Sequence, residues 1–328
     1  MPSSNSTLTA LKGVRVGHAQ DLKHRTGTTV VLLGPPATAF ADTRGGWPGS
    51  FDTAASGLGK TFLRYHALFL TGGDVYGYDA AIGIRRFLLE RGLAQERGGG
   101  RMPAIMGTNI YDVDFGPLEG RDFVALGARA CRDASSRPVV QGTVGAGTGA
   151  TVGPLLERHD LKGTKGGLGS SAAKVGRWTV GTLVVTNSVG NVYDPFEGRT
   201  LAGTHRSGGD KFLEMDDLLE AYLERSPTRF GTTIGVVGTD APLDHEQLAR
   251  LVELAHDGLA LAVRPAHMST DGDAILGFCT GGRPAQRLDY RAFDVLHSVA
   301  VREVARATVN AVLKATGLGS YEGLADSP

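Results

Sequence analysis

The stretch Arg229-Phe230-Gly231-Thr232-Thr233 places a hydroxyl side chain directly after a glycine, where an apolar β-branched segment begins. Because glycine has no Cβ, the peptide bond before Thr232 can adopt a strained conformation that other residues resist. The Thr232 hydroxyl could then attack the Gly231 carbonyl, and hydrolysis of the resulting ester would leave Thr232 with a free α-amine. Such a threonine is a nucleophile that carries its own base. The alternative is an ordinary turn before a strand.

The run GAGTG at 145–149 has the glycine spacing of a dinucleotide-binding loop but lacks the rest of that motif. Gly153 and Pro154 interrupt the helix that should follow it, and the run SSAAKVGRW about 20 residues on contains no acid. The chain also contains no GxxxxGK[ST], HExxH or GxSxG sequence. We therefore expect no nucleotide cofactor.

A metal site is the other cofactor to consider. His267, Asp271 and Asp273 could outline an oxygen-rich site, but mixed His and carboxylate spacings of this kind are common by chance. The remaining His residues are scattered along the chain. We therefore expect neither a metal nor any other cofactor.

The composition narrows the class of protein. The 328 residues carry 34 basic and 34 acidic side chains, so no positive excess favours a nucleic-acid partner. With 48 glycines, usage is about twice the ordinary level, which suits tight turns and close backbone approach. Cys131 and Cys279 are too few for a disulfide framework. The sequence has neither a signal peptide nor an apolar run of about 20 residues, so we expect a cytoplasmic protein without a membrane partner.

Strand-like and helix-like segments alternate, which predicts a layered α/β architecture. The glycine-rich run at 161–169 is expected to be a surface loop. Strands are expected at 28–33, 178–186, 232–237 and 274–279, and helices at 79–92, 121–132, 211–225, 245–263 and 288–316, the last in one or two pieces.

Short signatures follow one another in a fixed order from about Val14 to Gly317. They are VRVGHAQDLKHRTGTT at 14–29, KTFLRYHALFLTGGDVYGYD at 60–79, NIYD at 109–112, GAG at 145–147, SSAAKVG at 170–176, VTNSVG at 185–190, GTTI at 231–234 and DGD at 271–273. In this order the sequence resembles the self-processing hydrolases that comprise the L-aminopeptidase/D-esterases, the β-peptidyl aminopeptidases and the nylon-oligomer hydrolases.

The resemblance implies a layered α/β sandwich shared with ornithine acetyltransferase, and an inactive precursor. The single unit 1–328 would be cut between Gly231 and Thr232 into an α chain, 1–231, and a β chain, 232–328. The two chains would stay associated, and a homo-oligomer of such αβ units is expected. The expected substrate is a small peptide or amide oligomer.

The resemblance also assigns roles by position. Thr232 matches the nucleophile, and Asn187 matches an Asn that donates to the oxyanion, a contribution of about 3 kcal/mol when well placed. Tyr111 matches a Tyr whose hydroxyl lies on the same side of the site as that Asn. The alternatives are a turn-forming role for Asn187 and a core position for Tyr111.

Charged residues complete the expected site. Lys174 matches a Lys close to the nucleophile, where its ammonium could lower the pKa of the amine or hold a carboxylate. Asp271 and Asp273 match a pair that orients the nucleophile, and Gly272 allows the tight turn that brings them together, so that one would hold a proton. The alternatives are a solvated surface Lys and a surface turn.

The sequence mixes the patterns of two subfamilies. Gly231 follows the aminopeptidases, whereas the Thr-Thr-Ile and Asp-Gly-Asp runs follow the nylon-oligomer hydrolases. Where the aminopeptidases carry a Glu that suits a free ammonium, this chain has the neutral Asn109, which favours an endo-amidase for internal or blocked amides. The alternative is an aminopeptidase for free-amine β- or D-peptides. Asp74 is a second candidate for substrate binding, or it caps the helix beginning nearby.

Two other functions remain to be compared. An acyltransferase of the ornithine acetyltransferase type would pass the acyl group to an amine, but its Ala-Thr-Met-Leu-like cleavage neighbourhood is absent. An inactive homologue would fold without cleaving, and a denaturing gel would then show one band near 34 kDa.

Overall fold

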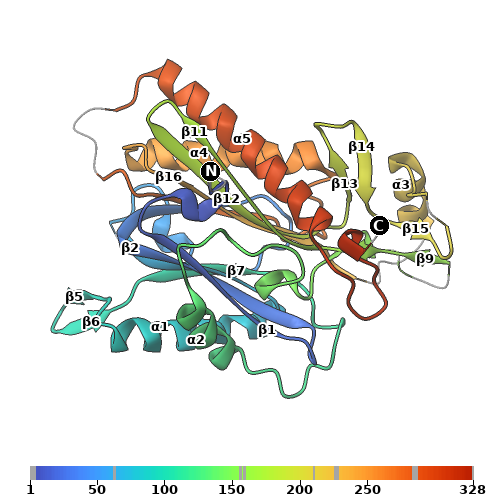
Figure 1. Cartoon of the computed structure of the whole chain (residues 1–328), viewed down its shortest axis with the longest axis horizontal. Coiled ribbons are helices and arrows are strands. Elements are labelled where there is room, and N and C mark those ends of the chain that lie inside the picture. The colour runs from blue at the N-terminus through green and yellow to red at the C-terminus, as the bar shows by residue number, and fades with distance from the viewer. Residues whose placement is uncertain are drawn as a thin grey trace.

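The core of the fold is a mixed nine-stranded β-sheet (Figure 1). The computed structural model describes residues 5–61, 64–154, 157, 160–209, 211–224, 229–282 and 287–326. Neighbouring strands are antiparallel except for two parallel pairs, β16 with β18 and β4 with β7. The strand order is β11 (Gly167–Val175), β12 (Trp178–Asn187), β16 (Thr232–Thr239), β18 (Ala274–Cys279), β2 (Thr26–Thr43), β4 (Arg64–Thr71), β7 (Ile105–Asn109) and β3 (Ser50–Phe51), with β1 (Val14–Asp21) paired to β2.

Two pairs of helices cover the sheet from opposite sides (Figure 1): α4 (His245–Ala262) with α5 (Tyr290–Leu313), and α1 (Ala80–Glu90) with α2 (Phe123–Asp133). Helices α4 and α5 pack on side chains such as Val184 and Val237, whereas α1 and α2 pack on Val30 and Phe69. Alternate side chains on the same strands, such as Ile234, form a third cluster that joins β16 and β18 to β1, β4 and β7. This layering confirms the predicted α/β sandwich.

Strand β2 continues well beyond the predicted range 28–33 and is 18 residues long. Pro35 and Pro36 have no N–H to donate, and the pairing with β4 shifts register before it resumes at Ala37. From there β2 pairs with β18 as far as Thr43. The prolines therefore interrupt the ladder without ending the strand, and β2 links both halves of the sheet.

The helices largely follow their predicted ranges. Helix α5 is a single helix, and α3 (Met215–Glu224) begins later than the predicted 211–225, one end of which lies outside the described residues. The Asp244 and Asp289 side chains accept backbone hydrogen bonds at the starts of α4 and α5. Among the described helices, none combines the length and apolar content that a membrane-spanning segment requires.

Short strands and 3₁₀ turns connect these layers. The predicted surface loop at 161–169 is instead mostly buried and forms β9, β10 and the start of β11. The short elements are η1 (Leu8–Ala10), η2 (Ala54–Ser56), η3 (Asp74–Asp79), η4 (Gly145–Gly147), η6 (Leu324–Asp326), β5 (Gln95–Arg97), β6 (Gly100–Met102), β8 (Thr151–Val152), β9 (Leu161–Lys162), β10 (Thr164–Lys165), β13 (Asn191–Asp194), β14 (Arg199–Ala202), β15 (His205–Arg206) and β17 (Val263–Arg264).

Candidate active site

Thr232 is the first residue of β16, between β12 and β18. In β12, which is antiparallel to β16, Asn187 is the direct partner of Thr232. On the other side β18 runs parallel to β16, so the turn at 271–273 that leads into β18 lies at the same end of the sheet. The pairing of three strands therefore brings Thr232, Asn187, Asp271 and Asp273 together, as the sequence predicts.

The peptide bond before Thr232 is held on both sides. The Gly231 N–H donates to the Thr270 carbonyl (3.3 Å), and the Gly231 carbonyl oxygen accepts from the Gly272 N–H (3.2 Å). The Thr232 hydroxyl donates to the same carbonyl oxygen. A Cβ at position 231 would lie 2.5 Å from Asp271 Oδ1, and Gly231 does not adopt a positive φ. The glycine is therefore needed for close approach, and not for the strained backbone conformation expected from the sequence.

Asn187 is buried and its amide is oriented from both ends. Its Oδ1 accepts a 2.8 Å hydrogen bond from Thr151 N, and its Nδ2 donates to the Tyr111 carbonyl at 3.3 Å. An amide nitrogen carries two N–H groups, so a second donor stays available beside Thr232. This arrangement suits the predicted contact with an oxyanion.

Asp273 connects β16, which begins at Thr232, to the turn before β18. Its Oδ1 accepts a 2.6 Å hydrogen bond from Thr233 N, and its Oδ2 accepts from His267 N (3.0 Å) and lies 2.8 Å from His267 Nδ1. The carboxylate thus fixes the backbone directly after Thr232. Within the part of the chain that the structure describes, no group of three or more His, Cys, Asp or Glu residues is arranged to hold a metal ion.

Asp271 binds backbone N–H groups on the other side of Thr232. Its Oδ1 accepts from Val189 N (3.2 Å) and its Oδ2 from Met268 N (3.3 Å). Burial, reinforced by the nearby Asp273 carboxylate, raises the pKa of Asp271 to about 8. Asp271 therefore holds a proton at neutral pH, as the sequence predicts for one member of the pair.

Lys174 does not lie with these residues. It is exposed near the end of β11 and pairs with Thr179, whereas Asn187 is eight positions further along β12. At roughly 3.3 Å per residue, these two positions on β12 are about 26 Å apart. The assignment of Lys174 to the site is therefore corrected, because the direction of the hairpin carries it away from Thr232.

Lys165 is the lysine that the structure brings to this region. Its fully buried Nζ donates to the carbonyl oxygens of Gly147 (3.0 Å), Ala150 (2.7 Å) and Gly166 (2.8 Å). Ala150 precedes Thr151, whose N–H holds Asn187. Burial lowers the pKa of Lys165 to about 7, although the Asp112 carboxylate opposes this effect. The sequence feature that could have indicated this role is the position of Lys165 in a glycine-rich run, where backbone carbonyl groups can approach a side chain closely.

A small cavity of about 60 Å³ opens beside Thr232. Of the described residues that line it, Asp74 alone is charged. The cavity brings Thr232 and Tyr111 of the predicted catalytic residues together with both predicted substrate-binding residues, Asn109 and Asp74. Its lining comprises Trp47, Asp74, Asn109, Tyr111, Phe230, Gly231, Thr232 and Thr270.

Asp74 and Asn109 come from adjoining elements. Asn109 is the last residue of β7 and is 2% exposed, and the Asp74 N–H donates to the carbonyl of Ile110 (3.1 Å). Asp74 begins η3, whose N-cap is Gly73 with no side-chain cap, so the predicted capping role is not observed. Burial raises the pKa of Asp74, and the Asp74 charge contributes to raising the pKa of Tyr111.

Asp112 is a buried residue whose role the sequence did not reveal, although it ends the NIYD signature. Its Oδ1 accepts from Gly73 N (2.7 Å) and Arg121 Nη1 (3.1 Å), and its Oδ2 accepts from the Thr26 hydroxyl (2.7 Å). Burial raises the pKa of Asp112 to about 6 against the opposing charge of Arg121. Asp112 thereby fixes the turn that presents Asp74 to the cavity.

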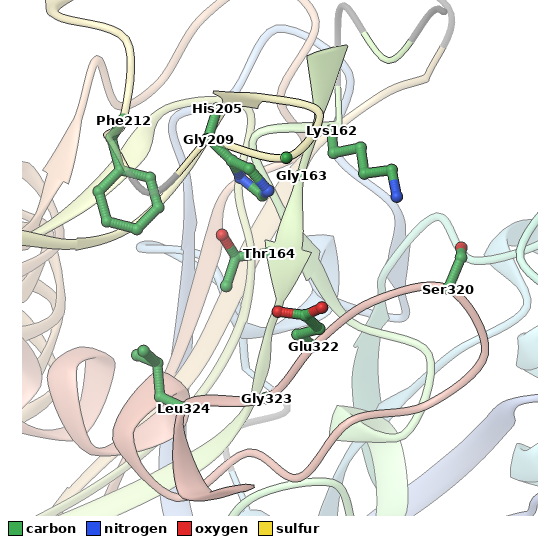
Figure 2. Close-up of a pocket in the computed structure, with 11 residues that line it drawn as sticks. Lys162, Gly163, Thr164, His205, Gly209, Phe212, Ser320, Glu322, Gly323 and Leu324 are labelled. Atoms are coloured by element: carbon green, nitrogen blue, oxygen red, sulfur yellow. The ribbon is translucent and has the colours of Figure 1, made fainter. Parts of the chain in front are cut away.

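A larger hollow of about 660 Å³ lies outside this site (Figure 2). Side chains from β9, β10, β15 and the C-terminal segment surround it, among them Lys162, Thr164, His205 and Glu322 (Figure 2). None of the predicted site residues is among its lining residues. The smaller cavity is therefore the candidate active site, because Thr232, the predicted nucleophile, lines it.

Solved structures share this fold. A β-aminopeptidase of Burkholderia sp. superimposes with a TM-score of 0.70 at 24% identity, over 99% of this chain and 92% of that one. The L-aminopeptidase D-Ala-esterase/amidase of Ochrobactrum anthropi, described as a variant of the Ntn hydrolase fold, gives 0.70 at 20% identity over 96% and 88%. The chain thus shares the fold of these two structures, a variant of the Ntn hydrolase fold.

The sequence comparisons define the family. Peptidase family S58 matches residues 6–325, so the chain belongs to this family. An uncharacterized aminopeptidase of Mycobacterium tuberculosis is 36% identical over 293 residues, which cover 84% of this chain and 82% of the relative. A 6-aminohexanoate-oligomer endohydrolase of Paenarthrobacter ureafaciens is 29% identical over 82% of this chain and 73% of the relative. The prediction of a hydrolase acting on amide bonds is confirmed.

The two lysines provide a matched pair of variants. Lys165→Met keeps the apolar stem but removes the ammonium that donates to three carbonyls of this loop, so we expect Asn187 to be displaced and kcat to fall on the order of 100-fold. Lys174→Met removes an exposed ammonium and should leave kcat within about twofold. The measurement is amide hydrolysis per correctly folded molecule, with Tm recorded for both variants. Equal effects of the two substitutions would contradict the placement of Lys165.

The raised pKa of Asp271 predicts a pH-dependent stability difference. The unfolded carboxyl titrates near 3.8 and the folded one near 8, so the stability contributed by the protonated form is lost as the pH rises between these values. In a Thr232→Ala background, Tm of Asp271→Asn minus Tm of the parent should therefore increase from pH 5 to pH 8. Thermal melts across this pH range measure the difference, and the exposed Glu90→Gln serves as the control. A difference in Tm that did not change between pH 5 and pH 8 would contradict the account.

Proposed function

We propose that the chain is a self-cleaving amide hydrolase whose nucleophile is Thr232. The observation that carries this proposal is the contact between the Thr232 hydroxyl and the Gly231 carbonyl oxygen, beside Asn187 and the buried carboxylates Asp271 and Asp273. A hydroxyl and a carbonyl held in contact within one chain react as an intramolecular pair, which removes most of the entropic barrier.

Self-cleavage follows from this geometry in two steps. Thr232 Oγ1 bonds to the Gly231 carbonyl carbon, the Gly231–Thr232 C–N bond breaks, and the departing nitrogen takes the hydroxyl proton. The Gly272 N–H already contacts the carbonyl oxygen that becomes negative, and the Asn187 amide supplies a further donor. Water then hydrolyses the ester, which leaves a Gly231 carboxylate and restores the Thr232 hydroxyl next to a free α-amine.

Turnover would reuse the same groups. The Thr232 α-amine takes the hydroxyl proton, Oγ1 attacks the substrate amide, and the amine released takes a proton as it leaves. Water then hydrolyses the acyl-enzyme. Lys165 keeps the loop that holds Asn187 in place, and Tyr111 lines the cavity on the same side.

The products of self-cleavage would be an α chain, 1–231, and a β chain, 232–328. Residues from both chains build the core, because β16 lies between β12 and β18, so the two chains should stay associated. A homo-oligomer of αβ units and a cytoplasmic location remain predictions. Light scattering on the purified protein measures the first.

The cavity favours one substrate class. Neutral Asn109 suits an internal or blocked amide, the substrate of the nylon-oligomer-hydrolase-like endo-amidase that the sequence favours. The Asp74 carboxylate, however, is the charged group beside Thr232, and a carboxylate favours a substrate with a free ammonium. We therefore propose that small peptides or amide oligomers with a free amine on the acyl side are preferred, as for an aminopeptidase.

Replacement of the nucleophile tests the core of the proposal. Thr232→Ala should give one uncleaved, inactive chain, because one hydroxyl serves both maturation and turnover. Thr232→Ser keeps the oxygen and should still cleave and hydrolyse amides. Denaturing gels and an amide hydrolysis assay make the comparison. A cleaved and active Thr232→Ala protein would remove the mechanism.

A pair of substrates that differ only in acetylation of the amine tests the role of Asp74. We expect the free amine to be preferred by about tenfold in kcat/KM, less than a fully buried ion pair would give, because Asp74 is half-buried. Asp74→Asn should abolish the preference, whereas Asp79→Asn, at the exposed end of η3, should not change it. Asn109→Glu should increase it. Equal rates on both substrates would instead favour the endo-amidase.

A further inference from the structure

Arg229, three residues before Thr232, is fixed by groups from distant parts of the chain. Its Nε lies 3.1 Å from Asp114 Oδ2, and its Nη2 donates to the Asp114 carbonyl at 3.2 Å. Its Nη1 donates to the Tyr321 hydroxyl (2.6 Å) and lies 3.8 Å from Glu157 Oε2. The Arg229 side chain is 18% exposed, so these charge-assisted contacts are shielded from water.

The partners of Arg229 are themselves connected. The Tyr321 hydroxyl donates to Glu157 Oε2, and burial together with this carboxylate raises the pKa of Tyr321. The Tyr321 ring packs edge-on against Phe115 at 5.1 Å, and the guanidinium of Arg229 lies over the Tyr321 ring at 5.6 Å. We call Arg229, Asp114, Glu157 and Tyr321 the Arg229 clamp.

Phe230, the next residue, is held between two aromatic rings. Its ring centroid lies 5.1 Å from that of Trp47 and 5.5 Å from that of Tyr111, in edge-to-face geometry. The two side chains that precede the cleavage site are thus both fixed, and Gly231 alone spans the distance from them to Thr232.

We propose that Arg229 is a positioning residue for self-cleavage: the Arg229 clamp holds the segment before Thr232 so that the Gly231 carbonyl stays against the Thr232 hydroxyl. This inference rests on the proposed self-cleavage at Gly231–Thr232. Arg229 touches neither reacting atom, and it acts by restricting the position of the Gly231 carbonyl.

The clamp separates maturation from turnover. In the precursor, Phe230 and Gly231 form part of the wall of the cavity beside Thr232, where a substrate would bind. After cleavage the new carboxyl end at Gly231 must leave that cavity, and the Thr232 hydroxyl then acts on an external amide. Loss of the Arg229 clamp should therefore slow self-cleavage and leave the mature enzyme unimpaired.

The experiment follows maturation and turnover separately. Cleavage is timed by denaturing gel after a pulse of cell-free synthesis, and kcat/KM is measured on the cleaved fraction, normalised to the free Thr232 amine. We expect Arg229→Ala to slow cleavage at least about tenfold while kcat/KM stays within about threefold. Arg229→Lys keeps the charge but not the fork of donors, so it should restore cleavage in part. Arg199→Ala, which removes an exposed ion pair with Glu197, is the matched control.

Several results would overturn the inference. A wild-type chain that cleaves, together with Arg229→Ala cleaving at the same rate, would refute the role of Arg229 alone. A wild-type chain that never cleaves would refute the proposed function as well. Melts of Thr232→Ala with and without Arg229→Ala test for a general loss of folding. A large fall of Tm in the double variant would show that Arg229 has a general structural role. A loss of kcat/KM in the cleaved fraction as large as the loss in cleavage rate would show that Arg229 also serves turnover.

Discussion

The burial of two carboxyl groups next to each other is the constraint on which the site depends. Asp271 and Asp273 are each 1% exposed, and two ionised carboxylates in such a place would repel each other strongly. Two effects stabilise this buried pair. Backbone N–H groups from separate segments donate hydrogen bonds to the carboxyl groups, namely those of Val189, Met268, Thr233 and His267, and the raised pKa of Asp271 keeps a proton on that carboxyl. Each donor that stabilises the pair also fixes a piece of backbone around Thr232.

The same constraint explains why small residues surround the nucleophile. Gly231 approaches Asp271 and Val189 so closely that a side chain would collide with both, and Gly272 approaches Thr232 itself. Glycine in these positions is a condition for packing the carboxylates against the Gly231–Thr232 peptide bond. Asn187, fixed from the opposite strand by Thr151 and Lys165, completes the environment of the carbonyl oxygen.

Much of this arrangement could be predicted from the sequence, because it depends on local patterns. The strands at 232–237 and 274–279 are recognisable from their apolar and β-branched residues, and the family resemblance, carried in part by the DGD and VTN runs, places Asp271, Asp273 and Asn187 in the site. The resemblance assigned Lys174 wrongly, because the order of signatures along the chain does not show which way the β11–β12 hairpin runs. The roles of Asp112 and Arg229 could not be predicted because partners such as Thr26 and Tyr321 are distant in the chain. Lys165 lies near its partners in the chain, but only the fold shows that its ammonium is buried among their carbonyl groups.

The central claim is that this chain cuts itself before Thr232. Intact-mass measurement of the purified protein under denaturing conditions tests it directly, because the masses of the fragments locate the cut to one residue. The account predicts two species that correspond to residues 1–231 and 232–328, the second beginning with an unmodified Thr232 amine. A single species of 34.3 kDa, or a cut at any other bond, would contradict it.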